Sequence, residues 1–305
     1  MWEKDLISIH DLDPRDVSEL FELAADIKID AAGYSSRLAG KTLALIFQKS
    51  STRTRVSFEV GMFQLGGHAL FLSSRDIQLG RGESIEDTAK VLSRYVDGVM
   101  ARTYAHQDVV DLARFGTIPV INGLTDELHP CQALADFFTL SENFEDLSGR
   151  RVAYIGDGNN MAHSLMLAAP KVGVDIAVAS PEGFVVSESY AAKARQAAER
   201  AGTRVVLTRD PREAVEGASA VITDVWASMG QEEEAEERLQ AFAGFTVDGT
   251  LMAAARPEAV FLHCLPAHRG EEVTAEVADG LQSRIFDEAE NRLHVQKAIL
   301  VKLMA

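Results

Sequence analysis

Short apolar stretches alternate with longer amphipathic stretches along the whole chain. Brief apolar runs that end at polar or turn-forming residues are typical of buried strands, and apolar residues at helical spacing between them are typical of packed helices. In the first half, strands are predicted at 42–47, 68–72, 98–101 and 118–121. The pattern restarts in the second half, with strands predicted at 151–155, 175–179, 204–207, 220–223 and 259–262. This alternation predicts an α/β fold with mainly parallel sheets flanked by helices.

Helices are predicted where a polar cap precedes apolar residues at helical spacing. Asp13-Pro14 is one such start, because an acidic cap followed by proline suits the first turn of a helix. Further helices are predicted at 56–65, 84–95, 131–143, 161–172, 187–201 and 290–304.

The chain has 305 residues, a length that suggests two domains. A polar break, Leu147-Ser148-Gly149-Arg150, separates the first run of strands from the second. We therefore predict one domain over 1–147 and another over 148–289. The C-terminal helix, 290–305, is expected to return to the first domain.

Composition narrows the class of protein. Hydrophobic residues make up 47% and charged residues 25%, which is typical of a globular protein. A formal charge of −16 argues against nucleic acid as a partner, and no apolar run is long enough to predict a membrane span. Two cysteines cannot form a disulfide scaffold in a chain of this length, and the N-terminus lacks the basic and apolar regions of a signal peptide. The expected compartment is the cytoplasm.

A cluster of hydroxyl and arginine side chains follows the first predicted strand, at Gln48-Lys49-Ser50-Ser51-Thr52-Arg53-Thr54-Arg55. The first N–H groups of a helix lack internal partners and carry the positive end of the helix dipole, so this position favours an anion. Arg53 or Arg55 can bind phosphate oxygens in bidentate fashion. The alternative is an ordinary helix cap with solvated arginines. A Walker loop is a poor match, because Gly40-Lys41-Thr42 lacks the earlier glycine and precedes the strand.

Four segments together are similar to the aspartate and ornithine carbamoyltransferase family. They are FQKSSTRTRVSFEV, DIQLGRGESIEDTAKVL, MARTY and HPCQALAD, and with the motifs of the second half the likeness covers essentially the whole chain. The resemblance implies an enzyme that uses carbamoyl phosphate as its carbamoyl donor. It implies that the phosphate is held by Ser51, Thr52, Arg53 and Thr54. It also implies that the carbamoyl group is surrounded by Arg102, His129, Gln132 and Arg292.

The resemblance further implies a homo-oligomer, typically built from trimers. Gln78 matches a position that reaches into the site of a neighbouring subunit, where many family members have histidine. The chemistry of Arg102 and His129 agrees with the resemblance, because the carbonyl oxygen of carbamoyl phosphate becomes an oxyanion under attack by an amine. Fixed donors aimed at such an oxygen contribute on the order of 3 kcal/mol each to transition-state stabilisation.

The second half contains a possible dinucleotide motif in YIGDGNNM. Gly156 and Gly158 follow a predicted strand, but Met161 occupies the place of the third glycine and no acidic residue ends the next strand. A nicotinamide-dependent oxidoreductase is therefore a weak alternative. The family resemblance instead implies that Asn160 binds the amino-acid end of the second substrate.

Two further motifs resemble the ornithine branch of the family and predict L-ornithine as the carbamoyl acceptor. In DVWASMG the implied contacts are Asp224, Ser228 and Met229. In HCLP, Cys264 and Leu265 are implied to surround the reacting δ-amine. Putrescine, an acetylated ornithine and aspartate remain alternative acceptors, and a carbamoyl-phosphate-binding regulatory subunit is disfavoured because donors for both substrates are present.

Cys264 also has readings independent of the family: a buried apolar residue, a zinc ligand or a nucleophile. Among the cysteines and histidines, no pair has the Cys-x-x-Cys or His-x-x-x-His spacing of a zinc site. His263 is adjacent to Cys264, and neighbouring side chains on an extended strand point in opposite directions. We therefore expect no metal and no cofactor, with Arg102, His129, Cys264 and Arg292 as the catalytic residues.

Overall fold

The computed structural model describes residues 4–73, 82–227 and 235–305. Gln78, Ser228 and Met229 lie outside these ranges. The chain forms two compact units, one of residues 1–134 and 290–305 and the other of residues 135–289. The division falls within helix α5 (Pro130–Asn143), so the domain boundary after residue 147 stays a prediction.

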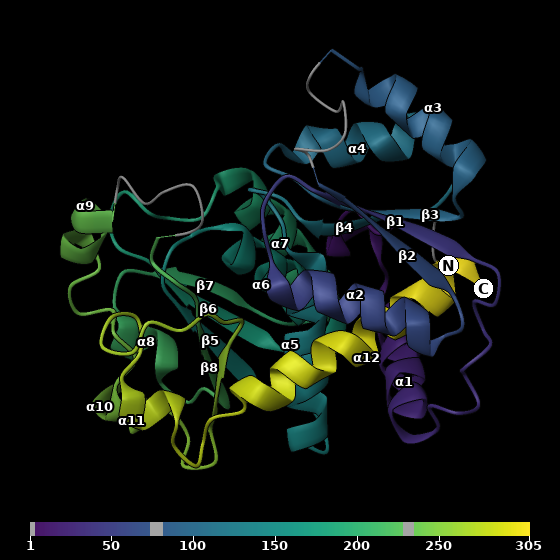
Figure 1. The fold of residues 1–305 in the computed structure, drawn as a ribbon. Coiled ribbons are helices and arrows are strands. Elements are labelled where there is room, and N and C mark those ends of the chain that lie inside the picture. Colours follow the sequence, from purple (N-terminus) through teal and green to yellow (C-terminus); the bar gives the residue numbers. More distant parts are fainter. Residues whose placement is uncertain (1–3, 74–81, 228–234) are drawn as a thin grey trace. The chain divides into compact units, whose positions relative to one another are not determined.

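The first unit contains a parallel sheet with the strand order β2-β1-β3-β4 (Figure 1). Its strands are β1 (Thr42–Phe47), β2 (His68–Ser73), β3 (Gly98–Arg102) and β4 (Val120–Leu124). Alternate residues of β1 and β3, such as Ala44 and Val99, pack in a core with Ala89, Val109 and Leu112 from two helices. The other β1 positions are also buried, which explains why this strand is a continuous apolar run.

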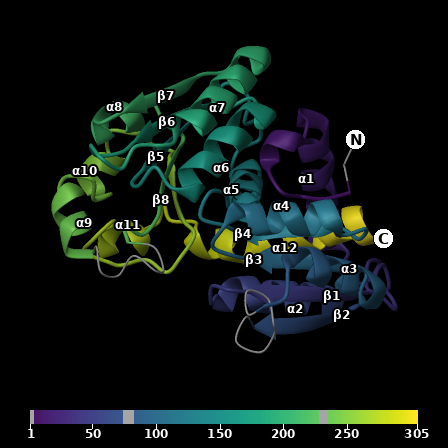
Figure 2. The same cartoon turned by 90° about the horizontal axis from the view of Figure 1, so that it is seen from above.

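Helices cover the first sheet. They are α1 (Pro14–Ile29), α2 (Thr52–Gln64), α3 (Ile85–Tyr95), α4 (His106–Phe115) and the C-terminal part of α12 (Ile285–Met304). Helices α3 and α4 lie side by side (Figures 1 and 2). Helices α2 and α12 approach closely at Gly61, where a Cβ atom would lie 3.3 Å from Cγ of Lys297. The C-terminal helix therefore belongs to the first unit from Glu290 onward, as the sequence predicts.

The second unit contains a parallel sheet with the order β7-β6-β5-β8-β9. Its strands are β5 (Arg151–Ile155), β6 (Asp175–Ala179), β7 (Val205–Thr208), β8 (Ala220–Thr223) and β9 (Val260–His263). Its helices are α6 (Asn160–Ala168), α7 (Glu188–Ala201), α8 (Pro211–Val215), α9 (Ala235–Ala241), α10 (Gly249–Met252) and α11 (Ala275–Ala278), with a 3-10 turn at Ala169–Val172. Helices α6 and α7 lie side by side (Figure 2), while residues of α8, α10 and α11 share a core with inward-facing residues of the sheet.

Two predicted helix starts are wrong in a way that affects the site. Helix α2 begins at Thr52, four residues before the predicted start, so the Ser/Thr/Arg cluster forms the first helical turn. Helix α12 begins at Ile285, so Arg292 lies in its interior and not at its N-terminal end. Helix α4 was not predicted.

Candidate active site

In each sheet, the chain first adds strands on one side of the initial strand and then crosses over to add strands on its other side. The position between the initial strand and the first strand on that other side is called the switch point. In the first sheet it lies between β1 and β3, and in the second between β5 and β8. Ligands of open parallel sheets bind beyond the carboxyl ends of the strands at such points. The predicted motifs lie there: Ser51 follows β1, Arg102 ends β3, Asn160 follows β5 and Asp224 follows β8.

The first turn of α2 is built to receive an anion. Ser51 is the N-cap residue, and its hydroxyl accepts a hydrogen bond from the Thr54 N–H at 3.2 Å. The first turn contains no acidic residue, so no side chain within that turn neutralises the positive end of the helix. Thr52 is exposed at the first helical position, and Arg53 is half-buried beside it.

The two arginines of the cluster differ in their surroundings. The Arg55 Nε donates to Glu59 at 2.9 Å, and its guanidinium lies 3.6 Å from the ring centroid of Phe71. Arg55 is therefore engaged along the outer surface of α2. Arg53 is close enough to His129 to affect its pKa. Of the two alternatives raised by the sequence, the geometry favours Arg53 for an anion at the helix start.

Arg292 joins three helices of the first unit within a buried network. Its Nη1 donates to the Gln132 Oε1 at 2.7 Å, and its Nη2 donates to the Thr54 Oγ1 at 3.1 Å. With the Gln296 amide oriented to satisfy its neighbours, its oxygen accepts from the Arg292 Nη2 at 3.0 Å and its nitrogen donates to Ser57 Oγ at 2.5 Å. The network links the start of α2, the first turn of α5 and α12. Three of the predicted carbamoyl-phosphate residues thus contact one another directly.

His129 lies immediately before α5 and is only 5% exposed. Burial lowers its pKa well below the usual histidine range, and the positive charges of Arg292, Arg102 and Arg53 lower it further. The imidazole is therefore neutral at neutral pH. A neutral imidazole among three guanidinium groups can donate an N–H to a ligand without adding charge.

Gln48 and Lys49 complete the edge of this site, and the sequence interpretation gave neither a role. The Gln48 N–H donates to the Arg102 carbonyl at 2.8 Å, which ties the loop after β1 to the end of β3. Lys49 is 7% exposed, pairs with Asp126 and lies 4.6 Å from the ring centroid of Tyr104. Lys49 is part of the same sequence motif, but its burial and its pairing with Asp126 are evident only from the structure.

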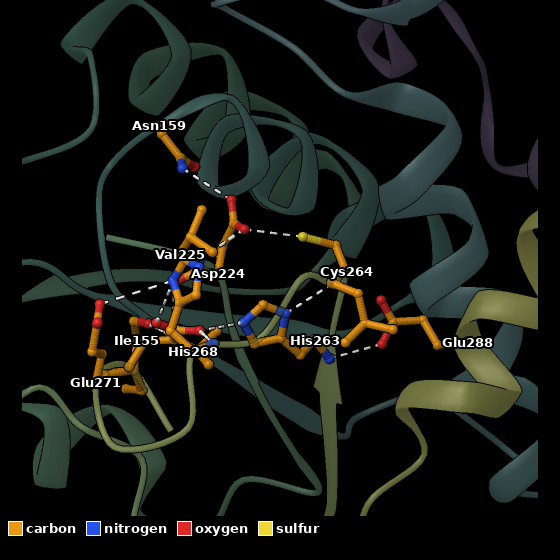
Figure 3. A network of polar contacts seen from close by, with 12 residues as sticks. Ile155, Asn159, Asp224, Val225, His263, Cys264, His268, Glu271 and Glu288 are labelled. Atoms are coloured by element: carbon orange, nitrogen blue, oxygen red, sulfur yellow. Dashed lines mark hydrogen bonds and ion pairs between the residues drawn. The ribbon is translucent and has the colours of Figure 1, made fainter. Parts of the chain in front are cut away.

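In the second unit, Asp224 is the centre of the polar network shown in Figure 3. Its carboxylate accepts hydrogen bonds from the Val225 N–H at 2.8 Å, the Asn159 Nδ2 at 3.2 Å and the Cys264 thiol at 3.0 Å. Asp224 is 7% exposed. A nearly buried carboxylate whose described donors are uncharged can receive a cationic ligand.

Two adjacent asparagines open α6, and they have different positions. Asn159 is the N-cap residue, accepting from the Met161 N–H at 2.9 Å while its amide nitrogen reaches Asp224. The predicted ligand, Asn160, is the half-buried first residue of the helix. The sequence pattern indicates only the local capping role of Asn159. Its contact with Asp224, which is 65 positions away, is evident only from the structure.

Cys264 is a neutral thiol in these surroundings. Burial by the surrounding protein raises its pKa well above the ordinary thiol value, and the nearby carboxylates of Asp224, Glu288 and Asp136 raise it further. A nucleophilic cysteine needs the opposite environment, with cations or a helix start that favour the thiolate. The cysteine-nucleophile interpretation is therefore disfavoured.

The backbone of Leu265 is held by His263. Leu265 adopts a left-handed conformation with φ of 60°, which is uncommon for a bulky residue. Its N–H donates to the His263 Nδ1 at 2.9 Å. Since Nδ1 is an acceptor, the ring proton of neutral His263 lies on Nε2 and is donated to Glu272 at 3.1 Å. The His263 N–H donates to Glu288 at 2.8 Å, so the HCLP turn is fixed from both sides.

The Gly-x-Gly of the second unit has a packing role. A Cβ atom on Gly158 would lie 2.2 Å from the Val186 backbone nitrogen and 2.3 Å from the Val185 carbonyl carbon. The Gly158 N–H also donates to the Phe184 carbonyl at 2.7 Å. In a dinucleotide-binding fold, the glycine lets a pyrophosphate approach the backbone. Here another segment of the same chain approaches Gly158 instead.

Together, the fold and these two residue sets define a two-unit α/β protein with a candidate site for an anion in one unit and a candidate site for a cationic ligand in the other. The chain belongs to the aspartate/ornithine carbamoyltransferase family. Residues 4–142 match the family's carbamoyl-P binding domain, and residues 148–303 match its Asp/Orn binding domain.

Relatives resemble the chain over nearly its full length. An ornithine carbamoyltransferase of Anoxybacillus flavithermus is 57% identical over 303 residues, covering 99% of this chain and 96% of the relative. The solved structure of ornithine carbamoyltransferase from Pyrococcus furiosus has a TM-score of 0.95 and 54% identity, covering 98% of this chain and 96% of that one. That from Gloeobacter violaceus has a TM-score of 0.90 and 48% identity, covering 100% and 99% of the two chains. Among the described residues, no helix has the length and apolar character needed to cross a membrane.

Proposed function

We propose that this protein transfers the carbamoyl group of carbamoyl phosphate to the δ-amine of L-ornithine, giving L-citrulline and inorganic phosphate. The observation that carries the proposal is the nearly buried Asp224 carboxylate, which accepts from Cys264 and Asn159 at the switch point of the second sheet. This set suits the α-ammonium of an amino acid. Relatives at 53–57% identity that carry the name ornithine carbamoyltransferase support the same acceptor.

The donor is held in the first unit. In this proposal the start of α2, with Ser51, Thr52, Arg53 and Thr54, binds the phosphate through backbone N–H groups, hydroxyls and a guanidinium. Arg102, His129, Gln132 and Arg292 surround the carbamoyl group. Because His129 is neutral, it donates an N–H to the carbonyl oxygen and stabilises the negative charge that develops there.

The acceptor amine must lose a proton before it can attack, since the pKa of a free alkylamine is near 10. The neutral thiol of Cys264 and the backbone carbonyl of Leu265 are suited to orient an uncharged amine. The ammonium gives its first proton to solvent and reacts as the uncharged amine. The amine nitrogen then bonds to the carbamoyl carbon, the bond from that carbon to the phosphate oxygen breaks, and the departing phosphate takes up the second proton, which the nitrogen sheds after the attack. No covalent enzyme intermediate is needed. In the proposal, Asn160, Ser228 and Met229 hold the amino-acid end with Asp224.

The test is a carbamoyl-transfer assay with ornithine, N-acetylornithine, putrescine and aspartate offered in parallel. We expect citrulline from ornithine and little product from the other acceptors. Asp224→Asn should mainly raise the KM for ornithine, because it removes the charge that pairs with the α-ammonium. Preference for putrescine, which lacks an α-carboxylate, or an unchanged KM for ornithine would contradict the proposal. Arg53→Ala should abolish turnover and leave the fold intact, and near-normal activity would refute its role.

We also propose a homotrimer or a multiple of trimers, acting in the cytoplasm. An exposed apolar surface of the first unit supports the assembly: Val56 and Phe63 of α2 are 50% and 80% exposed, and Leu70 of the edge strand β2 is 41% exposed. Residues seven apart in a helix share one face, so the two α2 side chains point the same way. Gln78, on the segment after β2, would complete a neighbour's site. The two free cysteines agree with a reducing compartment.

A further inference from the structure

A turn next to the HCLP motif gathers one imidazole and two carboxylates outside the residues that the proposed reaction uses. His268, Glu271 and Glu272 each offer a ligand atom, and these atoms all lie within 4.8 Å of one another. The His268 Nδ1 is 3.9 Å from the Glu271 Oε2 and 3.7 Å from the Glu272 Oε2. Figure 3 shows His268 and Glu271 close together on one side of His263.

Glu272 gives this turn a property that a surface acidic cluster lacks. Its side chain is completely buried. One carboxylate oxygen, Oε1, accepts from the His263 Nε2 at 3.1 Å and from the His268 N–H at 2.5 Å. The other oxygen, Oε2, is buried and accepts no hydrogen bond from any described residue, and it faces the His268 ring.

The groups that donate to the Glu272 carboxyl group carry no charge. The Leu265 N–H points at the His263 Nδ1, so this ring acts as a neutral donor to Glu272. Buried carboxylates are commonly paired with a cation or bound to a metal ion, and the His268 ring faces the free Oε2 with its Nδ1 at 3.7 Å. The position at Oε2 lies between two further ligand atoms, which makes it suitable for a metal ion.

From this geometry we propose that His268, Glu271 and Glu272 bind a divalent transition-metal ion, with Zn²⁺ as the best fit. One imidazole nitrogen and two carboxylate oxygens form a three-ligand set of the kind that zinc accepts, with water in the fourth position. An ion about 2.0–2.2 Å from each ligand in tetrahedral geometry holds the ligand atoms roughly 3.4 Å apart. The observed separations include 3.7 Å and 3.9 Å, and none exceeds 4.8 Å, so rotations of the His268 and Glu271 side chains, which are both about half exposed, can close the site around an ion.

Such an ion has a structural consequence for the neighbouring motif. It fixes the Glu272 carboxylate, which holds His263, and His263 in turn holds the backbone of Leu265. The ion acts as a clamp behind the HCLP turn and takes no part in carbamoyl transfer. Zinc motifs of paired histidines and cysteines do not include this site, because two of its three ligands are glutamates.

The test uses the full chain, freed of metal with a chelator and titrated with Zn²⁺ by calorimetry at neutral pH. We expect one bound ion per chain and a higher Tm with Zn²⁺ present, because a ligand that binds only the folded state stabilises it. His268→Ala and Glu271→Gln should each weaken binding on the order of 100-fold or more, since even partners behind the ligands contribute 10- to 100-fold. Titration with Co²⁺ should give the visible absorption of a tetrahedral site.

Two controls separate this site from others. Cys264→Ala removes the competing thiol next to Asp224, and His10→Ala removes an exposed histidine of the first unit. Both variants should bind Zn²⁺ as the wild type does. Binding that is lost in Cys264→Ala and retained in His268→Ala would overturn the proposal, as would the absence of Zn²⁺ binding at neutral pH. Glu272 is left intact because it also holds His263.

Discussion

The protonation state of His129 follows from its neighbours and not from the residue type. Burial and the charges of Arg292, Arg102 and Arg53 depress its pKa well below the ordinary value near 6.5. Since the unfolded chain binds the proton more readily, this residue costs stability as the pH falls below about 6.5, and the cost grows until the depressed pKa is reached. Above that range the neutral ring carries no such cost.

We predict that the His129 ring stays neutral at a pH where the histidines of the unfolded chain take up a proton. In ¹⁵N-histidine NMR spectra, its ring nitrogens should keep neutral-form shifts as the pH is lowered through about 6.5. His129→Gln identifies the signal, and the urea-unfolded protein provides the reference for an ordinary histidine titration. A His129 signal that titrates as it does in the unfolded protein would show that the arginine charges and burial do not act as described.

The Cys264 thiol offers a second test of charge at the residue scale. Asp224→Asn keeps a hydrogen-bond acceptor but removes the carboxylate that has the largest effect on the thiol pKa after burial. The pKa of Cys264 should therefore fall while burial keeps it elevated. In a Cys131→Ala background, iodoacetamide should then modify Cys264 faster, by about tenfold for each unit by which the pKa falls. Asp279→Asn, at an exposed ion pair, should leave the rate unchanged. An equal rate in both variants would contradict the role of Asp224.

The candidate residues of the site can be named from the sequence, whereas their contacts cannot. Ser51 and Arg53 are candidates for an anion site because a strand, a cap and a helix start are local patterns. The pairing of Arg292 with Gln132 joins residues 160 positions apart, and no local pattern encodes it. The neutral state of Cys264 likewise depends on Asp224 and Glu288, which only the fold brings near.

Helix α12 shows at the element scale how one side chain can hold several elements together. Its Arg292 donates to Thr54 of α2 and Gln132 of α5, and to Gln296 one turn later. These polar groups are buried, so the folded state would be less stable if any of them lacked a hydrogen-bond partner. The planar guanidinium can donate to all three groups at the same time, whereas the compact ammonium of lysine cannot reach all of them.

We predict that Arg292→Lys lowers the free energy of unfolding by about 1–3 kcal/mol, in addition to any loss of carbamoyl-phosphate binding. Urea unfolding of the ligand-free protein measures this effect separately from catalysis. Lys302→Ala is the control on the same helix, since its partly exposed ion pair with Glu19 should contribute less than about 1 kcal/mol. Equal stability of Arg292→Lys and the wild type would mean that the network does not hold the helices together.

Strands were easier to predict than helix starts. The predictions for β1, β5, β6 and β8 agree with the structure in both bounds, because buried parallel strands are continuous apolar runs. The start of α2 was placed late because its first turn contains Thr and Arg residues that carry no apolar period. The residues before Glu290 were left out of α12 for a similar reason, since that segment is rich in acidic residues.

At the scale of the whole molecule, the alternation of apolar and amphipathic stretches predicts the class of fold but not the order of the strands. Strand order places the switch points, and those points explain why the motifs after β1, β3, β5 and β8 carry the candidate ligands. The proposed assembly has its strongest support in the exposed apolar side chains of α2 and β2. An exposed edge strand beside exposed apolar side chains is an unfavourable surface for a monomer.

We predict that Phe63→Glu shifts the proposed trimer toward monomers, because it places a charge on that apolar surface. Sedimentation velocity at a series of protein concentrations measures the shift, and circular dichroism verifies that the chain stays folded. Leu281→Glu is the matched control, since Leu281 is 97% exposed in the second unit, far along the chain from α2. If the site takes Gln78 from a neighbour, the Phe63→Glu monomer should also lose carbamoyl transfer while the Leu281→Glu trimer keeps it. A monomeric wild type, or dissociation caused equally by both substitutions, would exclude this surface as the trimer interface.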